Sequence, residues 1–167
     1  MPTLTAWCYQ TPLGARRGEA RLHRLEDAEA LQVHCAIVVT WAPGAHRPRA
    51  AHVRHRGGDD LDDASMLSVV ARTVLAVATA PSPSSAADTA FGHLPETGID
   101  SSFLTSAARR FAPGSSVLLV LSGRADLDVV RSMVQQGVAA GEVELVRTEV
   151  PPDAVRRIAT LLDRPDG

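Results

Sequence analysis

The sequence predicts an α+β domain of the ferredoxin-like class: an antiparallel sheet in split βαβ order, with an inserted apolar helix and a C-terminal α-β-α extension. Length is the first observation, because 167 residues with 45% apolar content suit a single domain over residues 1–167 with an insertion at about 58–97. Periodic apolar patterns are the second, since they follow the order β-α-β-β-α-β once that insertion is set aside. The third is the stretch 98–122, which gives the clearest helix-then-strand signal. In this class both helices cover one face of the sheet, so we expect the other face to be free to dimerise or to bind.

The first 56 residues place one helix between strands. Thr3–Gln10 alternates between two faces, which is the period of a half-buried strand. Leu13–Leu31 repeats its apolar residues at the spacing of an amphipathic helix. Val33–Trp41 alternates again, and a Pro-Gly turn returns the chain as a third strand over Arg49–Arg56.

The inserted segment contains a helix, Met66–Ala78, that is apolar on nearly every side. Left in water, such a helix exposes more contiguous apolar surface than soluble monomers usually tolerate. Membrane association is not favoured, because Arg72 lies near the middle and the apolar run is slightly short for a span. We therefore expect protein to cover it, either the chain's own sheet or a second copy, with Arg72 pointing outward at the margin. Pro81–Ala87 has the composition of a linker.

The stretch 98–122 predicts a short helix and then a buried strand. Asp100 or Ser101 can cap the helix by accepting a backbone N–H. Its apolar stripe, spaced by four residues, is made of Phe103, Ala107 and Phe111. A Pro-Gly pair at 113 and 114 ends the helix. Val117–Leu121 is then a continuous run that is apolar on both faces, so something must cover each side of this strand.

The last part of the chain predicts a helix, a strand and a helix. Asp126 can cap the first helix, which ends at Gly137, and Val143–Val150 follows as a strand. Two prolines from Pro151 open the last helix, where proline is tolerated in the first turn. The apolar stripe of this last helix is made of Val155, Ile158, Ala159 and Leu162.

Two motifs carry a resemblance to a known family. They are Gly-Ile-Asp-Ser-Ser-Phe at 98–103 and Phe-Ala-Pro-Gly-Ser-Ser-Val-Leu-Leu-Val-Leu at 111–121, supported by the hairpin ahead of them and by residues 143–162 behind them. On these residues the chain resembles the bacterial family called domain of unknown function 1269, covering roughly the last 70 residues well and the first 60 weakly. The resemblance implies a fold but no chemistry, because that family has no established activity. Its members carry a Gly-rich, membrane-associated segment where this chain has Leu61–Leu94 with one glycine, which implies a soluble relative.

Composition excludes several classes of partner and location. A formal charge of −2 argues against a nucleic-acid partner. Cys8 and Cys35 are too few for a disulfide framework, and both fall on the inward face of their strands, so we expect inert core cysteines. The N-terminus lacks a basic stretch followed by an apolar core, so no signal peptide is expected. These features predict a cytoplasmic protein.

Histidines and acidic residues cluster near the hairpin, but they do not predict a metal site. His52 and His55 are three residues apart on a strand, so their side chains leave opposite faces, and His46 and Cys35 do not converge with them. The acidic run at 59–63 lacks the spacing of a calcium-binding loop. The chain has no Gly-x-Ser-x-Gly and no Gly-rich phosphate loop. We predict no metal, no cofactor and no catalytic residue, and we favour a non-enzymatic role.

The uncovered face of the predicted sheet is the remaining candidate for a binding site. By alternation it carries Trp7, Tyr9, His34, His52, Arg54 and Arg56. Aromatic side chains beside arginines on a four-stranded sheet are how RNA-recognition domains stack bases, but Ala50–Arg56 contains no aromatic residue. Another sheet or the inserted helix is therefore favoured as the cover of this face.

Two functions follow from these expectations. The favoured one is a non-enzymatic module that forms a homo-oligomer or binds an unidentified protein partner, because Val117–Leu121 and the helix Met66–Ala78 both need covering. The alternative is a small ligand-binding protein or enzyme, with a pocket between the outer face of the sheet and the inserted helix that uses His34, His52 and Arg54. A filled face would support the module, whereas a walled pocket with convergent polar groups would support the alternative.

Overall fold

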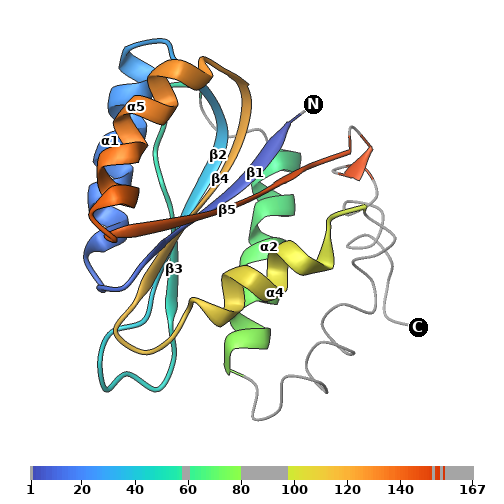
Figure 1. Cartoon of the computed structure of the whole chain (residues 1–167). Coiled ribbons are helices and arrows are strands. Elements are labelled where there is room, and N and C mark those ends of the chain that lie inside the picture. Colours follow the sequence, from blue (N-terminus) through green and yellow to red (C-terminus); the bar gives the residue numbers. More distant parts are fainter. Residues whose placement is uncertain (1, 58–60, 80–97, 152, 155, 157–167) are drawn as a thin grey trace.

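The computed structural model describes residues 2–57, 61–79, 98–151, 153, 154 and 156 (Figure 1). Within these residues the chain forms five strands and four helices. In order they are β1 (Thr3–Tyr9), α1 (Gly14–Asp27), β2 (Leu31–Thr40), β3 (Arg49–His52), α2 (Leu61–Thr79), α4 (Ser101–Arg109), β4 (Ser116–Ala125), α5 (Leu127–Ala139) and β5 (Val143–Glu149). The linker predicted at Pro81–Ala87, and most of the helix predicted after Pro151, lie outside the described residues.

The strands form one antiparallel sheet in the order β3-β2-β4-β1-β5. β4 lies between β1 and β2, and β1 lies between β4 and β5. The fold is α+β, as predicted, but its strand order is not the simple split βαβ order expected from the first six elements. β4 is buried along most of its length and takes the centre, whereas β3 is exposed at all four residues and takes the edge beside β2. β3 ends at His52, short of the predicted Arg56.

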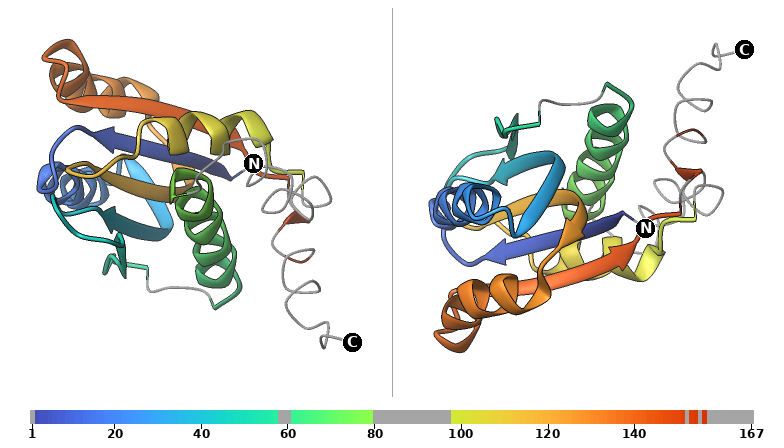
Figure 2. Two further views of the ribbon diagram at one scale, coloured as in Figure 1. Left: turned by 90° about the horizontal axis from the view of Figure 1, so that it is seen from below. Right: turned by 90° about the horizontal axis from the view of Figure 1, so that it is seen from above.

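Helices cover both faces of the sheet. α1 and α5 lie together against one face, and α2 and α4 lie against the other (Figures 1 and 2). This corrects the expectation that α1 and the helix after Gly98 share one face and leave the other open. The reason lies in β4, because Val117–Leu121 is buried on both sides and each side needs an apolar cover.

The core on one side of the sheet is built around α2. Met66, Val70 and Val74 are buried against the sheet and α4, while Arg72 is exposed. This confirms that the chain's own sheet covers the apolar helix and that Arg72 points outward. None of the helices in the described part of the chain has the length and apolar character needed to cross a membrane.

The core on the other side lies beneath α1 and α5. Leu22 and Leu25 of α1 pack with Trp7, Leu118 and Val120 of the sheet, and Val134 of α5 joins them. Tyr9 lies along α1 where two glycines make room for it. A Cβ on Gly14 would lie 2.4 Å from the Tyr9 Cβ, and a Cβ on Gly18 would lie 2.3 Å from the Tyr9 hydroxyl. Larger residues at 14 and 18 would therefore push the helix off the sheet.

Two predicted aspartate caps are confirmed. The Asp100 side chain accepts a hydrogen bond from the backbone N–H of Ser102 at the start of α4. The Asp126 side chain accepts from Asp128 and Val129 at the start of α5. Each cap satisfies amide groups that the first turn of a helix leaves unpaired, which explains why the helices begin where they do.

Candidate ligand-binding cleft

The structure does not bring the six residues of the predicted binding face together. Trp7 and Tyr9 are 4% and 3% exposed and belong to the core beneath α1 and α5. Their predicted position on an open face is corrected, because α1 covers that face. His52 and Arg54 are exposed at and beyond the edge strand β3, whereas His34 is half-buried on the opposite face from Trp7.

A cleft of about 1210 Å³ opens where α1 ends, β2 begins, α2 begins and β4 ends. We call it the His34 cleft. Ten residues line it: Glu26, Glu29, Leu31, Gln32, Val33, His34, Arg56, Gly57, Asp63 and Arg124. Most of them are polar, whereas the residues packed against either face of the sheet are apolar. Two residues of the predicted face, His34 and Arg56, are among them.

The floor of the His34 cleft depends on Gly123 of β4. A Cβ at this position would lie 2.6 Å from His34 Nε2 and 2.9 Å from Gln32 Oε1, so only glycine lets both side chains lie on the strand. β2 shifts its register with β4 on either side of Val33, which changes the alternation of side chains at this point. The backbone N–H of Arg124 donates to Gln32 Oε1 at 3.4 Å and holds that amide in place.

One side of the rim is made of paired charges. Glu26 Oε1 lies 3.8 Å from His55 Nδ1, and both side chains are buried. The Arg56 guanidinium lies 3.1 Å from Asp27 Oδ1, and its backbone N–H donates to Glu26. These contacts hold the chain beyond β3 against the end of α1, so this wall of the cleft is fixed in position.

Three polar side chains of the cleft have no partner in the described part of the chain. His34, Arg124 and Glu29 form no side-chain hydrogen bond or ion pair with any other described residue. Glu29 also has a backbone φ of 54°, a left-handed conformation that glycine usually takes after a helix. It is held there by hydrogen bonds from the amides of Glu29 and Ala30 back to Glu26 and Leu25. A non-glycine residue in that conformation is a form of strain found often at functional sites.

A second opening of about 410 Å³ shares the wall made by Glu26 and Arg56. Arg54 and His55 line it, and His23 Nε2 donates to the Arg54 carbonyl at 2.8 Å. Arg54 is therefore separated from His34 by this wall. His52 lines neither opening, so the predicted set of His34, His52 and Arg54 does not form one site.

The described lining of the His34 cleft consists mainly of charged and amide side chains. No serine, threonine or cysteine is among the described lining residues, so His34 has no nucleophile to activate there. In the described part of the chain, no group of three or more His, Cys, Asp or Glu residues is placed to hold a metal ion. The cleft can nonetheless offer a guanidinium, an imidazole, an amide and a carboxylate to a polar molecule.

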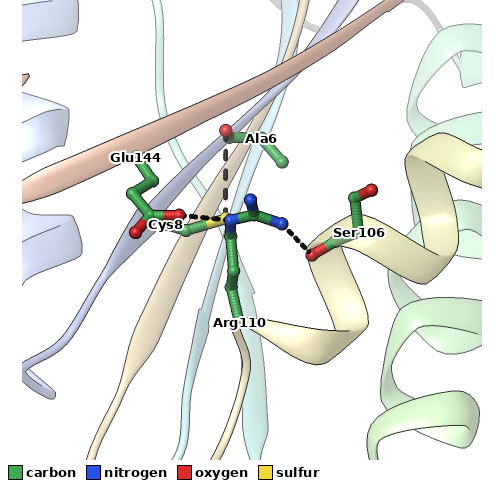
Figure 3. A network of polar contacts seen from close by, with 5 residues as sticks. All are labelled: Ala6, Cys8, Ser106, Arg110 and Glu144. Carbon is green, nitrogen blue, oxygen red and sulfur yellow. Dashed lines mark hydrogen bonds and ion pairs between the residues drawn. The ribbon is translucent and has the colours of Figure 1, made fainter.

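The two cysteines lie in the core, as predicted. Cys35 is fully buried, and Cys8 is 5% exposed beneath the network in Figure 3. There the Arg110 guanidinium pairs with Glu144 and donates to the Ser106 carbonyl. Burial raises the pKa of the Cys8 thiol to about 12, and the nearby Arg110 charge offsets only part of this effect. Cys8 therefore stays a neutral thiol and is not a nucleophile.

Sequence reasoning missed Gly123, Gln32 and Arg124. The signal for Gly123 was available, because it continues the same side of β4 as Val117, Leu119 and Leu121 but lacks a side chain. A glycine in a strand interior often marks the close approach of another group. Glu29 left no such signal, since its conformation becomes visible only in the structure.

No family model, curated protein or solved structure matches this chain. The resemblance to domain of unknown function 1269 stays a prediction.

Proposed function

We propose that this protein binds a small polar ligand with an anionic group in the His34 cleft. The single observation that carries the proposal is that His34 and Arg124, whose side chains have no partner in the described part of the chain, line one cleft whose floor requires Gly123. Unpaired polar groups that line a concave surface are the usual mark of a ligand site. The proposal takes up the alternative that the sequence left open, with the pocket at the sheet face beside the start of α2.

One arginine of the cleft supports an anionic group on the ligand, although carboxylates outnumber arginines in the lining. Arg56 is engaged by Asp27, which leaves Arg124 as the cation available to a carboxylate or phosphate. A guanidinium can bind either group through two parallel hydrogen bonds. Glu29 supplies an acceptor in the same cleft, so a hydroxyl or ammonium group elsewhere on the ligand would find a partner.

The test is a titration of the full chain with carboxylates, phosphate monoesters and amino acids, followed by NMR shifts and by melting temperature. We expect saturable binding for at least one of these classes, with shifts at His34 and Arg124. Arg124→Gln should weaken that binding about 10-fold or more, as expected for loss of a charge-assisted hydrogen bond. Arg109→Gln is the matched control, because Arg109 is exposed on α4 and does not line the cleft. Equal affinity in wild type and Arg124→Gln, or no binding by any class, would refute the proposal.

Self-association is a second candidate, favoured by one observation on β5. This strand forms one edge of the sheet over Val143–Glu149, and its Leu145 side chain is 43% exposed. A second copy could pair with that free edge. The two grounds that the sequence supplied for an oligomer no longer support it, because the chain itself covers β4 and α2. Light scattering at micromolar concentration tests this candidate, and only a 17.7 kDa species would count against it.

We also propose that the fold is ferredoxin-like through a different set of elements than predicted. β1-α1-β2 would form one split unit around β4, and β4-α5-β5 would form the other around β1. Strand order and the shared face of α1 and α5 support this assignment. β3, α2 and α4 would then be the insertion. Cys8 and Cys35, two buried cysteines in a chain with too few for a disulfide framework, support a reducing cytoplasmic location.

A further inference from the structure

Tyr9 contains a buried polar atom that the protein leaves unsatisfied. Its side chain is 3% exposed, and within the described part of the chain its hydroxyl forms no hydrogen bond of good geometry. The Arg21 guanidinium lies close enough to donate to the hydroxyl oxygen, but it cannot accept the hydroxyl proton. A buried hydroxyl without a partner is destabilising, and native proteins retain few such groups. The hydroxyl lies beside Gly18 and near the Arg21 guanidinium. This arrangement leaves the hydroxyl proton available to an acceptor that the described part of the chain does not supply.

A small cleft of about 190 Å³ adjoins Tyr9. It lies between the end of β1, the first two turns of α1 and the turn that joins α5 to β5. Eight residues line it: Tyr9, Gln10, Thr11, Gly14, Arg17, Arg21, Gly141 and Glu142. We call it the Tyr9 cleft. Its volume is below the roughly 300–1,000 Å³ of sites for drug-sized ligands, so it suits a small group.

Positive charge dominates the Tyr9 cleft. Arg17 is exposed and forms no hydrogen bond or ion pair with another described residue. Arg21 lies 3.6 Å from Glu142, a contact longer than a good charge-assisted hydrogen bond. The Arg21 guanidinium is held against α5, where a Cβ on Gly137 would lie 2.4 Å from its Nη1. Two arginines therefore face one glutamate, and one of the two has no partner.

We infer that the Tyr9 cleft binds a small oxyanion of the phosphate class, held by Arg17 and Arg21 with the Tyr9 hydroxyl as hydrogen-bond donor. This site is independent of the His34 cleft, because Gly14 and Glu26 lie at opposite ends of α1, roughly 18 Å apart at 1.5 Å per residue. The oxyanion would satisfy the buried hydroxyl and the unpaired guanidinium together. Its source is either free inorganic phosphate or the terminal group of a larger phosphate monoester.

The phenol is suited to the donor role. Burial raises the pKa of Tyr9 to about 12, and the charge of Arg21 together with a hydrogen bond from its guanidinium to the phenol oxygen lowers it by less than burial raises it. The hydroxyl therefore keeps its proton near neutral pH. A neutral phenol donates to an anion, whereas a phenolate would repel it.

The test uses the full chain and inorganic phosphate as the probe. Tyr9 is the single tyrosine, so the ¹³Cζ resonance of tyrosine reports on one hydroxyl. We expect this resonance to shift saturably as phosphate is added. Tyr9→Phe should weaken phosphate binding about 10-fold without lowering the melting temperature in the absence of phosphate, because the variant loses an unsatisfied group. Arg17→Gln should weaken binding at least as much, and Arg16→Gln should not, since Arg16 is its exposed neighbour outside the cleft.

A parallel titration with glycerol 3-phosphate distinguishes the two sources. Tighter binding of the monoester through the same residues identifies the terminal group of a larger molecule, and tighter binding of inorganic phosphate identifies the free ion. The inference is wrong if neither probe shifts the tyrosine resonance, or if Tyr9→Phe and Arg17→Gln bind as tightly as wild type. It is also wrong if Arg124→Gln abolishes phosphate binding while Arg17→Gln leaves it intact, because the ion would then occupy the His34 cleft.

Discussion

The shape of the His34 cleft depends on Gly123, because this residue has no Cβ atom. The atoms that a Cβ would meet, His34 Nε2 and Gln32 Oε1, are the ends of side chains that can rotate away. The backbone of β4 would not have to move. A substitution at Gly123 is therefore expected to change the shape of the cleft while leaving the stability of the fold nearly unchanged.

We predict that Gly123→Ala displaces His34 and Gln32 and removes ligand binding at the His34 cleft, with a stability change of no more than about 1 kcal/mol. Urea unfolding and the titration described above measure the two effects. Gly44→Ala is the control for ligand binding, because Gly44 does not line the cleft and its Cβ would meet nothing within 4 Å. Unchanged ligand affinity in Gly123→Ala would show that the floor of the cleft is not part of the site.

The raised pKa of Cys8 makes the folded protein less stable as the pH becomes alkaline. The thiol pKa is 9.0 in an ordinary environment and about 12 in the folded protein, so between these values the unfolded chain loses a proton that the folded chain keeps. The unfolded state is thereby favoured as pH rises. We predict that the contribution of Cys8 is fully present below pH 9 and falls by about 1–2 kcal/mol by pH 10.5. Urea unfolding at pH 8 and pH 10.5 measures it, and Cys8→Ala should lose less stability than wild type over the same interval.

At the scale of elements, α2 is the helix whose existence depends most on its neighbours. Its apolar residues lie nearly all round, and the sheet and α4 cover those that face inward. Its polar residues bond to the helix itself, since the hydroxyls of Ser68 and Thr73 donate to backbone carbonyls four residues earlier. The helix thus contributes to stability mainly by covering β2 and β4.

We predict that Val70→Asp destabilises the protein by about 3–5 kcal/mol, because Val70 is fully buried and the new carboxylate would have no partner. Ala76→Asp on the exposed side of the same helix should change stability by less than about 1 kcal/mol. Thermal unfolding of the two variants beside wild type gives the comparison. Similar losses in both variants would mean that α2 is not held against the sheet.

At the scale of the whole molecule, local structure was predictable from the sequence and strand pairing was not. The strands, helices and aspartate caps follow from periodicity and cap residues, which are local properties. β1 is apolar on both faces, with Leu4 and Ala6 on one and Trp7 and Tyr9 on the other. Alternation alone therefore did not show which face α1 covers. The position of β4 between β1 and β2 is a long-range property that no local pattern encodes.

The candidate site was predictable only in part, for the same reason. The structure places His34 near the start of α2 at the face of the sheet opposite α1, whereas the sequence grouped it with His52 and Arg54, which do not line the cleft. Arg124 and Gly123 come from the end of a strand that was recognised for its apolar centre, Val117–Leu121, and not for its polar end. Residues that meet through pairing of distant strands become visible only when that pairing is known.

We predict that prolonged treatment with a chelator leaves the melting temperature unchanged. His34 lies in its cleft and His52 on the edge strand, while His23 and His55 line the second opening, and no group of three or more possible ligands gathers among the described residues. They do not converge on one ion. Differential scanning calorimetry before and after dialysis against the chelator measures the effect. A large fall in melting temperature would reveal a structural metal.

The place of β1 between β4 and β5 has a consequence for the synthesis of the protein. β1 is made first, yet both of its partners, β4 and β5, are made in the last third of the chain, and Thr3 pairs with Ser122 and Glu149. The hairpin of β2 and β3 can form early, but β1 has no strand to pair with until most of the chain has left the ribosome. During that interval its apolar residues are exposed, and a nascent chain that stalls before Ser116 presents an unpaired strand to chaperones and to other nascent chains.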